Sequence, residues 1–300
     1  MNLQRYQKFL VLVPVVFSVL ALAAILVWGL KPGIDLKGGS LLEVEYQNGR
    51  PEVVAVQEKV DALNFGEIRI QPSGDKNLML RQRALSNAEK LTLDESLKTF
   101  GDIREVQYNS VGPSIGTELI NKAWWAIGFI TVSIILFIAF AFRHVSEPVS
   151  SWKYGVVAII TLLHDILVPT GLFAYLGHVR GAEVGALFIV ALLTILGISI
   201  NDTIVVFDRI RENLGKNEKK NRREAFVDVV WHSIMQTLTR SVNTSVTVVI
   251  MLAALFYVGP IATKDFALTL IVGMVAGTYS SIFLASPLLV YIERWQKKTK

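Results

Sequence analysis

The stretch Gly197–Asn213, GISINDTIVVFDRIREN, decides how the rest of the chain is interpreted. Its first half belongs to an apolar run long enough to cross a bilayer, yet this run carries Asp202 beside Asn201. An ionisable side chain at that depth costs about 2.5–3.5 kcal/mol on insertion scales, so it usually faces a bundle interior or a polar cavity. We therefore predict that Asp202 is a functional residue inside a membrane-spanning bundle.

The composition agrees with a membrane protein. Of the 300 residues, 52% are hydrophobic, and many of them lie in near-continuous apolar runs. Runs of about 20 residues are what a multispanning α-helical protein requires. The chain has no Cys, which excludes disulfides, thiolate metal sites and thiol redox chemistry.

The apolar runs predict six spans, near residues 9–30, 124–142, 156–176, 184–207, 238–258 and 266–292. Basic side chains cluster beside these runs, as the positive-inside rule expects. They are Arg209, Arg211, Lys216, Lys219, Lys220, Arg222 and Arg223, and, in the tail, Arg294, Lys297, Lys298 and Lys300. This bias predicts cytoplasmic termini. The basic loop is short and lacks interleaved aromatics, so we predict no nucleic-acid partner.

The first run leaves two interpretations open. Ala21-Leu22-Ala23 fits the small-x-small pattern of a signal-peptide cleavage site. The apolar run nevertheless continues through Trp28, and its length suits a full span, which favours an uncleaved signal-anchor.

Residues 32–119 are polar and mixed in charge, which predicts an external domain. Strands are predicted at 41–46, 67–71, 77–82 and 103–108, helices at 52–63 and 88–100, and a turn-rich link at 72–75. The order βαββαβ predicts a ferredoxin-like α+β fold. The whole chain is thus divided into an N-terminus with the first helix (1–31), this domain, a five-helix region (120–293) and a basic tail (294–300).

No enzyme chemistry is evident. No nucleophile and base stand at a convincing spacing, and there is no His cluster that would bind a metal. The pair Gly38-Gly39 lacks the spacing of a dinucleotide site. We predict a protein that is not an enzyme and has neither a cofactor nor a metal.

Two glycine-containing stretches flank the domain. One follows the first span and the other precedes the second, and both are interpreted as hinges that join the domain to the membrane. Their candidate residues are Gly33, Asp35, Gly38 and Gly39 in the first stretch, and Gly112, Pro113 and Gly116 in the second.

A second intramembrane charge is Arg240, in the fifth span. At helical spacing it shares a face with four polar residues, Gln236, Asn243, Thr244 and Thr247. Asp202 and Arg240 both fall in the cytoplasmic half of their spans, so their side chains could form an ion pair that protonation of Asp202 would release. A purely structural pairing remains the alternative.

The third span carries His164-Asp165 near mid-membrane, with Pro169 four residues further on. Two carboxylates, one Arg and one His are the parts of a proton relay. Either residue of the pair could instead bond a neighbouring helix. In the last span, Gly273, Gly277 and Ser281 make one helical face small, which favours close helix packing.

Taken together, these motifs resemble the SecF family, which forms the smaller subunit of the SecDF protein-export complex. The resemblance rests on residues 197–213, on the two stretches that flank the domain, on His164-Asp165 and on residues 239–245, TRSVNTS. These motifs occur in the family's order along essentially the whole chain.

The resemblance implies a proton-driven transporter of the resistance-nodulation-division superfamily in the bacterial inner membrane. It implies SecD, the SecYEG channel, YajC, YidC and the translocating preprotein as partners, and late translocation of secreted polypeptides as the function. Asp202 and Arg240 match the family's conduction residues, with a further Asp expected from SecD.

Two rival functions remain open at this stage. One is half of a proton-driven exporter of small molecules or lipids, for which an external domain of under about 90 residues is small. The other is a non-transporting scaffold, in which neutralising Asp202 would leave function intact. The coupling ion is also open, because a carboxylate in a polar cavity suits either a proton or sodium.

Overall fold

The computed structural model describes residues 3–141, 149–219 and 224–299. It divides into two compact units, each described here by itself. The α/β unit comprises Pro32–Trp124 with Val184–Ala186. The helical unit comprises Met1–Lys31, Trp125–Glu183 and Leu187–Lys300.

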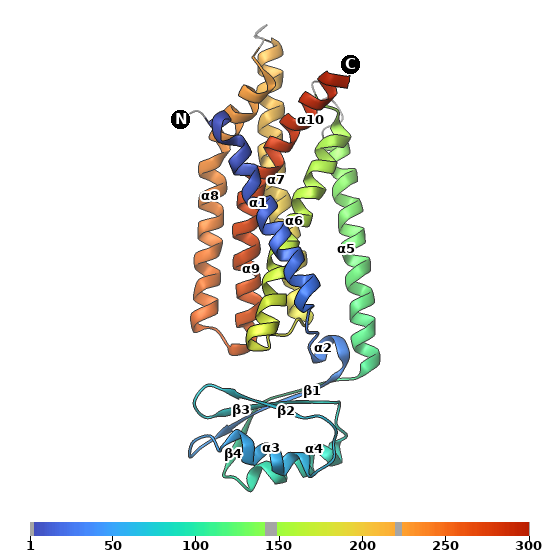
Figure 1. Ribbon diagram of the computed structural model, residues 1–300, viewed down its shortest axis with the longest axis vertical. Coiled ribbons are helices and arrows are strands. Elements are labelled where there is room, and N and C mark those ends of the chain that lie inside the picture. The colour runs from blue at the N-terminus through green and yellow to red at the C-terminus, as the bar shows by residue number, and fades with distance from the viewer. Residues whose placement is uncertain (1–2, 142–148, 220–223, 300) are drawn as a thin grey trace. The chain divides into compact units, whose positions relative to one another are not determined.

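Long helices dominate the chain (Figure 1). They are α1 (Leu3–Trp28), α5 (Pro113–Ala141), α6 (Ser151–Arg180), α7 (Ala186–Lys219), α8 (Phe226–Val258) and α9 (Ile261–Ser280), which the π-turn η1 (Ser281–Ala285) joins to α10 (Ser286–Thr299). Over the described residues, six segments are long and apolar enough to cross a membrane. The prediction of six spans is therefore confirmed.

Several helices extend well beyond the predicted spans. Helix α5 begins at Pro113 rather than near Trp124, α7 continues past Phe207 to Lys219, and α8 begins at Phe226 rather than near Leu238. Apolar runs mark only the lipid-facing part of a helix, whereas its backbone hydrogen bonds continue into water. The predicted span end Phe142 lies outside the described residues, as do the basic residues Lys220, Arg222, Arg223 and Lys300.

Small residues allow close helix contacts in the helical unit. Gly171 of α6 faces Ala21 of α1, and a Cβ built on Gly171 would lie 2.4 Å from the Ala21 Cα. Ala21, part of the signal-peptide-like motif, therefore has a packing role. The predicted close packing of the small face in α9 is confirmed as well, because Gly273 lies against Ile195 of α7 and Gly277 against Ser199. Such contacts replace the hydrophobic driving force that lipid does not provide.

The α/β unit contains a four-stranded antiparallel sheet of order β2-β3-β1-β4. Its elements are α2 (Ile34–Lys37), β1 (Gly39–Tyr46), α3 (Val53–Asp61), β2 (Arg69–Ser73), β3 (Asn77–Gln82), α4 (Asn87–Lys98) and β4 (Ile103–Val111). The predicted order of strands and helices is confirmed. The predicted turn-rich link at 72–75 was partly wrong, because Pro72 and Ser73 belong to β2. Because β2 is an edge strand, the missing N–H of Pro72 is tolerated there.

Alternate residues of β1 and β3 build the core of this unit. Leu42 pairs with Leu80 and Val44 with Leu78, and all four are buried. Helices α3 and α4 cover this face of the sheet in Figure 1, where they contribute Val56, Val60, Leu93 and Leu97 to the same core. The period-2 pattern of the strands and the helical pattern of α3 and α4 thus meet in one apolar layer.

Helix α4 begins with a capping box. The Ser86 side chain accepts a hydrogen bond from the Glu89 backbone N–H, while the Glu89 carboxylate accepts one from the Ser86 N–H. Hydrogen bonds from Arg83 and from Ser86 lower the pKa of Glu89 from 4.5 to about 2. Two otherwise unpaired backbone donors are satisfied in this way.

Candidate functional site

Asp202 lies on α7 with its carboxylate turned towards α8. One oxygen, Oδ1, accepts a hydrogen bond of 2.7 Å from the Ser241 hydroxyl. The other oxygen, Oδ2, is buried and has no hydrogen-bond partner among the described residues. A buried carboxylate oxygen without a donor is energetically unfavourable, so this side chain has an incomplete set of partners.

Arg240 does not form the expected ion pair with Asp202. Within the described residues no carboxylate lies within 4.0 Å of the Arg240 side chain, which is exposed on α8. The contact is made instead by the next residue, Ser241, which is buried. Successive residues of an α-helix point in directions about 100° apart, so only one of these two side chains can face α7.

The polar face predicted on α8 is exposed in this chain. Gln236, Asn243, Thr244 and Thr247 are all exposed, and so is Asn201 on α7. In a span, polar side chains rarely face lipid, because hydrocarbon offers them no hydrogen-bond partner. Thr244 and Thr247 donate to carbonyls of their own helix, whereas the exposed amide of Asn243 carries polar groups that lipid does not satisfy.

Asp165 forms a second and more enclosed polar centre. Its carboxylate is fully buried and accepts hydrogen bonds from the Ser280 hydroxyl at 2.6 Å, from the Ser199 hydroxyl, and from the neighbouring His164 ring through Nδ1 at 2.8 Å. These donors come from α9, α7 and α6. Three donors can satisfy a carboxylate away from water.

The π-turn η1 begins directly after Ser280. Ser280 binds Asp165, whereas the next residue, Ser281, lies 2.9 Å from the Thr203 hydroxyl of α7. Both serines are fully buried. Single-turn π segments within helices frequently occur at functional sites. Sequence analysis missed Ser199, Ser241 and Ser280, although Ser199 lies three residues before Asp202 and hence near the same helical face.

A small cavity lies between α7, α8 and α9. Its volume is about 30 Å³, and its lining includes Asp202, Ser199, Ser245, Gly277 and Thr278. About 10–15 Å³ of such volume holds one water when polar partners are present. The cavity therefore has room for one or two waters in a lining that includes Asp202.

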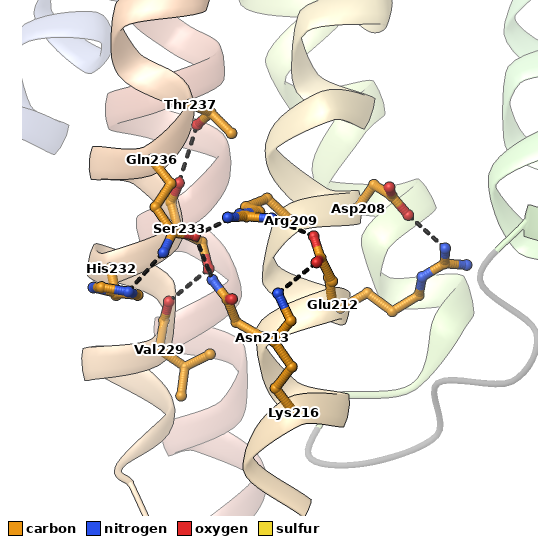
Figure 2. Close-up of polar contacts among 11 residues, drawn as sticks. Asp208, Arg209, Glu212, Asn213, Lys216, Val229, His232, Ser233, Gln236 and Thr237 are labelled. Carbon is orange, nitrogen blue, oxygen red and sulfur yellow. Dashed lines mark hydrogen bonds and ion pairs between the residues drawn. The ribbon is translucent and has the colours of Figure 1, made fainter. Parts of the chain in front are cut away.

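Nearer the basic loop, α7 and α8 are joined by a polar cluster that is centred on Gln236 (Figure 2). The Gln236 Oε1 accepts hydrogen bonds from Arg209 and, at 3.0 Å, from Asn213. With its oxygen so used, the amide NH₂ must donate to His232, whose Nε2 lies 2.6 Å away. His232 is therefore the acceptor in this contact.

Arg209 also pairs with Glu212, which binds Lys216 at 2.6 Å. The positive-inside rule alone accounts for Arg209 in the sequence. In the structure its side chain also binds Gln236 and Glu212, so it connects α7 to α8 as well. In Figure 2, Asp208 turns away from α8, and its ion partner is Arg211 at 2.6 Å.

The two stretches that flank the domain pack against each other within the α/β unit. Gly38 has a φ of +79°, and a Cβ built there would lie 2.7 Å from the Pro113 Cα. A Cβ on Gly116 would lie 2.6 Å from the Leu36 carbonyl oxygen. Only glycine fits these positions. Gly39 begins β1 opposite Val111, and Gly112 accepts the first helical hydrogen bonds of α5.

The first stretch also holds the start of α7. Gly33 donates a backbone hydrogen bond of 2.9 Å to Val184, and the Asp35 carboxylate accepts one of 3.0 Å from the Ala186 N–H. Ala186 is the first residue of α7. Asp35 therefore caps the helix that carries Asp202, a long-range contact that the sequence did not indicate.

We expect Asp35→Ala to loosen this helix start. Loss of a capping carboxylate typically costs about 0.5–2 kcal/mol. In this variant the loss would lower the free energy of unfolding of the first turn of α7. Amide hydrogen exchange at residues 186–190 should become faster. Asp75→Ala, in an exposed turn of the same unit, is the control. Unchanged exchange at α7 in Asp35→Ala would contradict the capping role.

Among the described residues, no group of three or more His, Cys, Asp or Glu side chains is placed to hold a metal ion. The geometry is that of a multispanning membrane protein that buries one carboxylate fully and another partly inside its helices. This is the protein class that the fold and the site define together.

Comparisons with known proteins identify the family. The model of the C-terminal region of the protein export membrane proteins SecD and SecF matches residues 92–295, and the SecD/SecF GG motif matches residues 23–49. The protein translocase subunit SecF of Thermobaculum terrenum is 41% identical over 288 residues, covering 91% of this chain and 87% of that protein. For SecF of Anaerolinea thermophila the identity is 37% over 294 residues, covering 97% and 92%.

A solved structure is similar as well. The crystal structure of SecDF from Thermus thermophilus, described as a translocon-associated membrane protein, matches with a TM-score of 0.83 and 31% identity. The match covers 98% of this chain but 39% of the SecDF chain. The chain belongs to the SecF family of protein-export membrane proteins, and it is a multi-pass subunit of the Sec protein-export machinery.

Proposed function

We propose that this SecF-family chain works with SecD to use the transmembrane proton gradient in late translocation of secreted polypeptides. The observation that carries the proposal is Asp202, a carboxylate within a span that lines a small cavity, with one oxygen on Ser241 and the other unpartnered among the described residues. Arg240, Asn201, Asp165 and His164 complete the proposed coupling site.

Protonation of Asp202 changes which arrangement of the helices is stable. The neutral acid tolerates its present surroundings, whereas the carboxylate anion needs a further donor or cation. Arg240, one residue from Ser241 and unpaired with any described carboxylate, is the nearest candidate on α8. A rotation of α8 by about 100° would exchange Ser241 for Arg240, and a proton on Asp202 would thus bias two arrangements of α7 and α8.

The exposed polar face of α8 is proposed to meet SecD. The SecF-like part makes up 39% of the matched SecDF chain, so a SecD-like remainder is available there to cover such a face. A further Asp from SecD would supply a partner for Arg240. The alternative, contact of Asn243, Thr244 and Thr247 with lipid, is unfavourable in hydrocarbon.

Site-specific cross-linking tests this contact. We expect a photoreactive residue at Thr244 to cross-link strongly to SecD in the membrane. The control is the same residue at Phe129, which is 75% exposed on α5. Equal or absent SecD adducts at the two positions would contradict the proposed interface.

The remaining assignments follow from topology. We propose that residues 32–119 form an external, periplasmic domain of the ferredoxin-like class. Residues 1–31 and 120–293 carry the six spans, which cross a bacterial inner membrane. The tail at 294–300 lies on the cytoplasmic side. The antiparallel order β2-β3-β1-β4, with one helix between β1 and β2 and another between β3 and β4, supports the fold class.

The Asp35 cap on α7 supports mechanical coupling between that domain and the helix of Asp202. Beyond SecD, the proposed partners are the SecYEG channel, YajC, YidC and the translocating preprotein. The proton-coupled function itself is tested by an Asp202→Asn variant in an export assay, whose expected result is export at the level of depleted cells.

A further inference from the structure

We propose that Asp165 is a second proton-binding carboxylate, and that Ser199 with the cavity beside it connects Asp165 to Asp202. This inference rests on the proposed function, in which Asp202 exchanges protons. It adds a route by which a proton bound at Asp202 reaches the buried Asp165.

The Asp165 end of the route is enclosed. No part of its side chain is exposed, and its described donors are His164, Ser199 and Ser280. Ser280 and His164 donate to one carboxylate oxygen, Oδ1, and Ser199 donates to the other, Oδ2. Of these donors, only Ser199 also lines the cavity.

The far side of His164 offers no exit for a proton. Its Nε2 is buried and has no partner among the described residues. The imidazole instead borders a pocket of about 320 Å³ between α1, α6 and α9, lined almost entirely by apolar side chains such as Val13, Phe17 and Val168. Apolar cavities stay dry, so protons do not pass through this pocket by way of water.

The Asp202 end of the route lies at the small cavity. Asp202 and Ser199 belong to the same lining, together with Ser245 and Thr278, whose hydroxyls contact each other. One or two waters there would have several polar partners, which is what a stably bound internal water needs. The cavity therefore supplies the bridge that Asp202 lacks.

The transfer balances at each step. The Asp202 carboxylic acid gives its proton to the cavity water, which gives one of its own to the Ser199 hydroxyl. Ser199 at the same time donates its hydroxyl hydrogen to Oδ2 of Asp165. The water and the serine end unchanged, Asp202 becomes an anion, and Asp165 becomes neutral.

The packing keeps this link short. A Cβ on Gly277 would lie 3.3 Å from the Ser199 Oγ and 3.6 Å from the Asp165 Oδ2, so a larger residue would press on both groups.

The titratable groups around Asp165 are His164 on its own helix, Asp202 across the cavity on α7, and Tyr279 of α9, which lines the apolar pocket with His164. Arg240 on α8 acts electrostatically on the Asp202 carboxylate.

Two serine variants test the route. Ser199→Ala and Ser280→Ala each remove one hydroxyl from Asp165, but only Ser199→Ala removes it from the cavity. In proteoliposomes that contain the complex with SecD, we expect the rate of proton exchange between Asp202 and Asp165 to fall about a hundredfold in Ser199→Ala and less than about threefold in Ser280→Ala, because a positioned proton-transfer group contributes at least 10². Gly277→Ala, which crowds Ser199 without removing a polar group, should also lower this exchange rate.

An infrared readout separates proton binding from structure. In the unaltered complex at low pH we expect a protonated-carboxyl band that Asp165→Asn removes. In Ser199→Ala the Asp165 carboxyl should no longer exchange its proton with Asp202. Equal exchange rates in Ser199→Ala and Ser280→Ala, with an inactive Asp202→Asn, overturn the second site alone. Normal flux in Asp202→Asn overturns the proposed function as well. Thermal unfolding and SecD co-purification establish that each variant is folded.

Discussion

Replacing Asp202 by Asn should reduce export of a secreted precursor to the level of cells that lack the chain. Asn has almost the same shape as Asp and can still accept the hydrogen bond from Ser241, so the bundle is retained. It cannot bind and release a proton, so the proton would no longer bias the arrangement of α7 and α8. The expected result is therefore loss of function in a folded complex.

The measurement is export in cells depleted of the native protein and supplied with Asp202→Asn, with expression and SecD co-purification shown to be unchanged. Asp208→Asn is the matched control, since it removes a carboxylate from the same helix at a position paired with Arg211. Near-normal export in Asp202→Asn would reject ion coupling at this residue and favour a scaffold.

The second large effect is expected from Gly171→Leu, and it concerns folding. A Cβ at this position would lie 2.4 Å from the Cα and 2.8 Å from the carbonyl oxygen of Ala21. Both contacts are with the backbone, so α1 as a whole has to move away from α6. Overpacking of a well-packed interior costs about 1–3 kcal/mol, and displacement of a whole helix falls at the upper end or beyond.

The folded yield and the thermal unfolding midpoint of Gly171→Leu should both fall. Gly128→Leu is the control, because Gly128 is also within a long helix but a Cβ there would meet no atom within 4 Å. If the two variants have equal midpoints, the close contact between α1 and α6 does not contribute to stability.

Residues with a local signal were predictable. The apolar runs gave the six spans because helix length and hydrophobicity are fixed by the bilayer. The alternation along 77–82 identified β3 with its observed bounds, since strand residues alternate between the two faces of a sheet. Asp202 was identified by its cost inside an apolar run, which needs no partner to be recognised.

Residues whose role depends on a distant partner were not predictable. Asp35 meets Ala186 across 151 positions of the chain, and Ser280 meets Asp165 across 115. A capping aspartate and a buried serine look ordinary in the sequence. Their partners are set by which helices and loops are neighbours, and a single sequence without pairing information does not contain this.

By itself, the sequence therefore determined the elements and which charged groups stand within apolar runs, because these depend on local hydrophobicity and period. Only the tertiary structure decided that Ser241 and not Arg240 contacts Asp202, and that Ser199 donates to Asp165 and lines the same cavity as Asp202. Neighbouring helix positions differ in direction by about 100°, so the rotation of each packed helix determines which side chain reaches its partner.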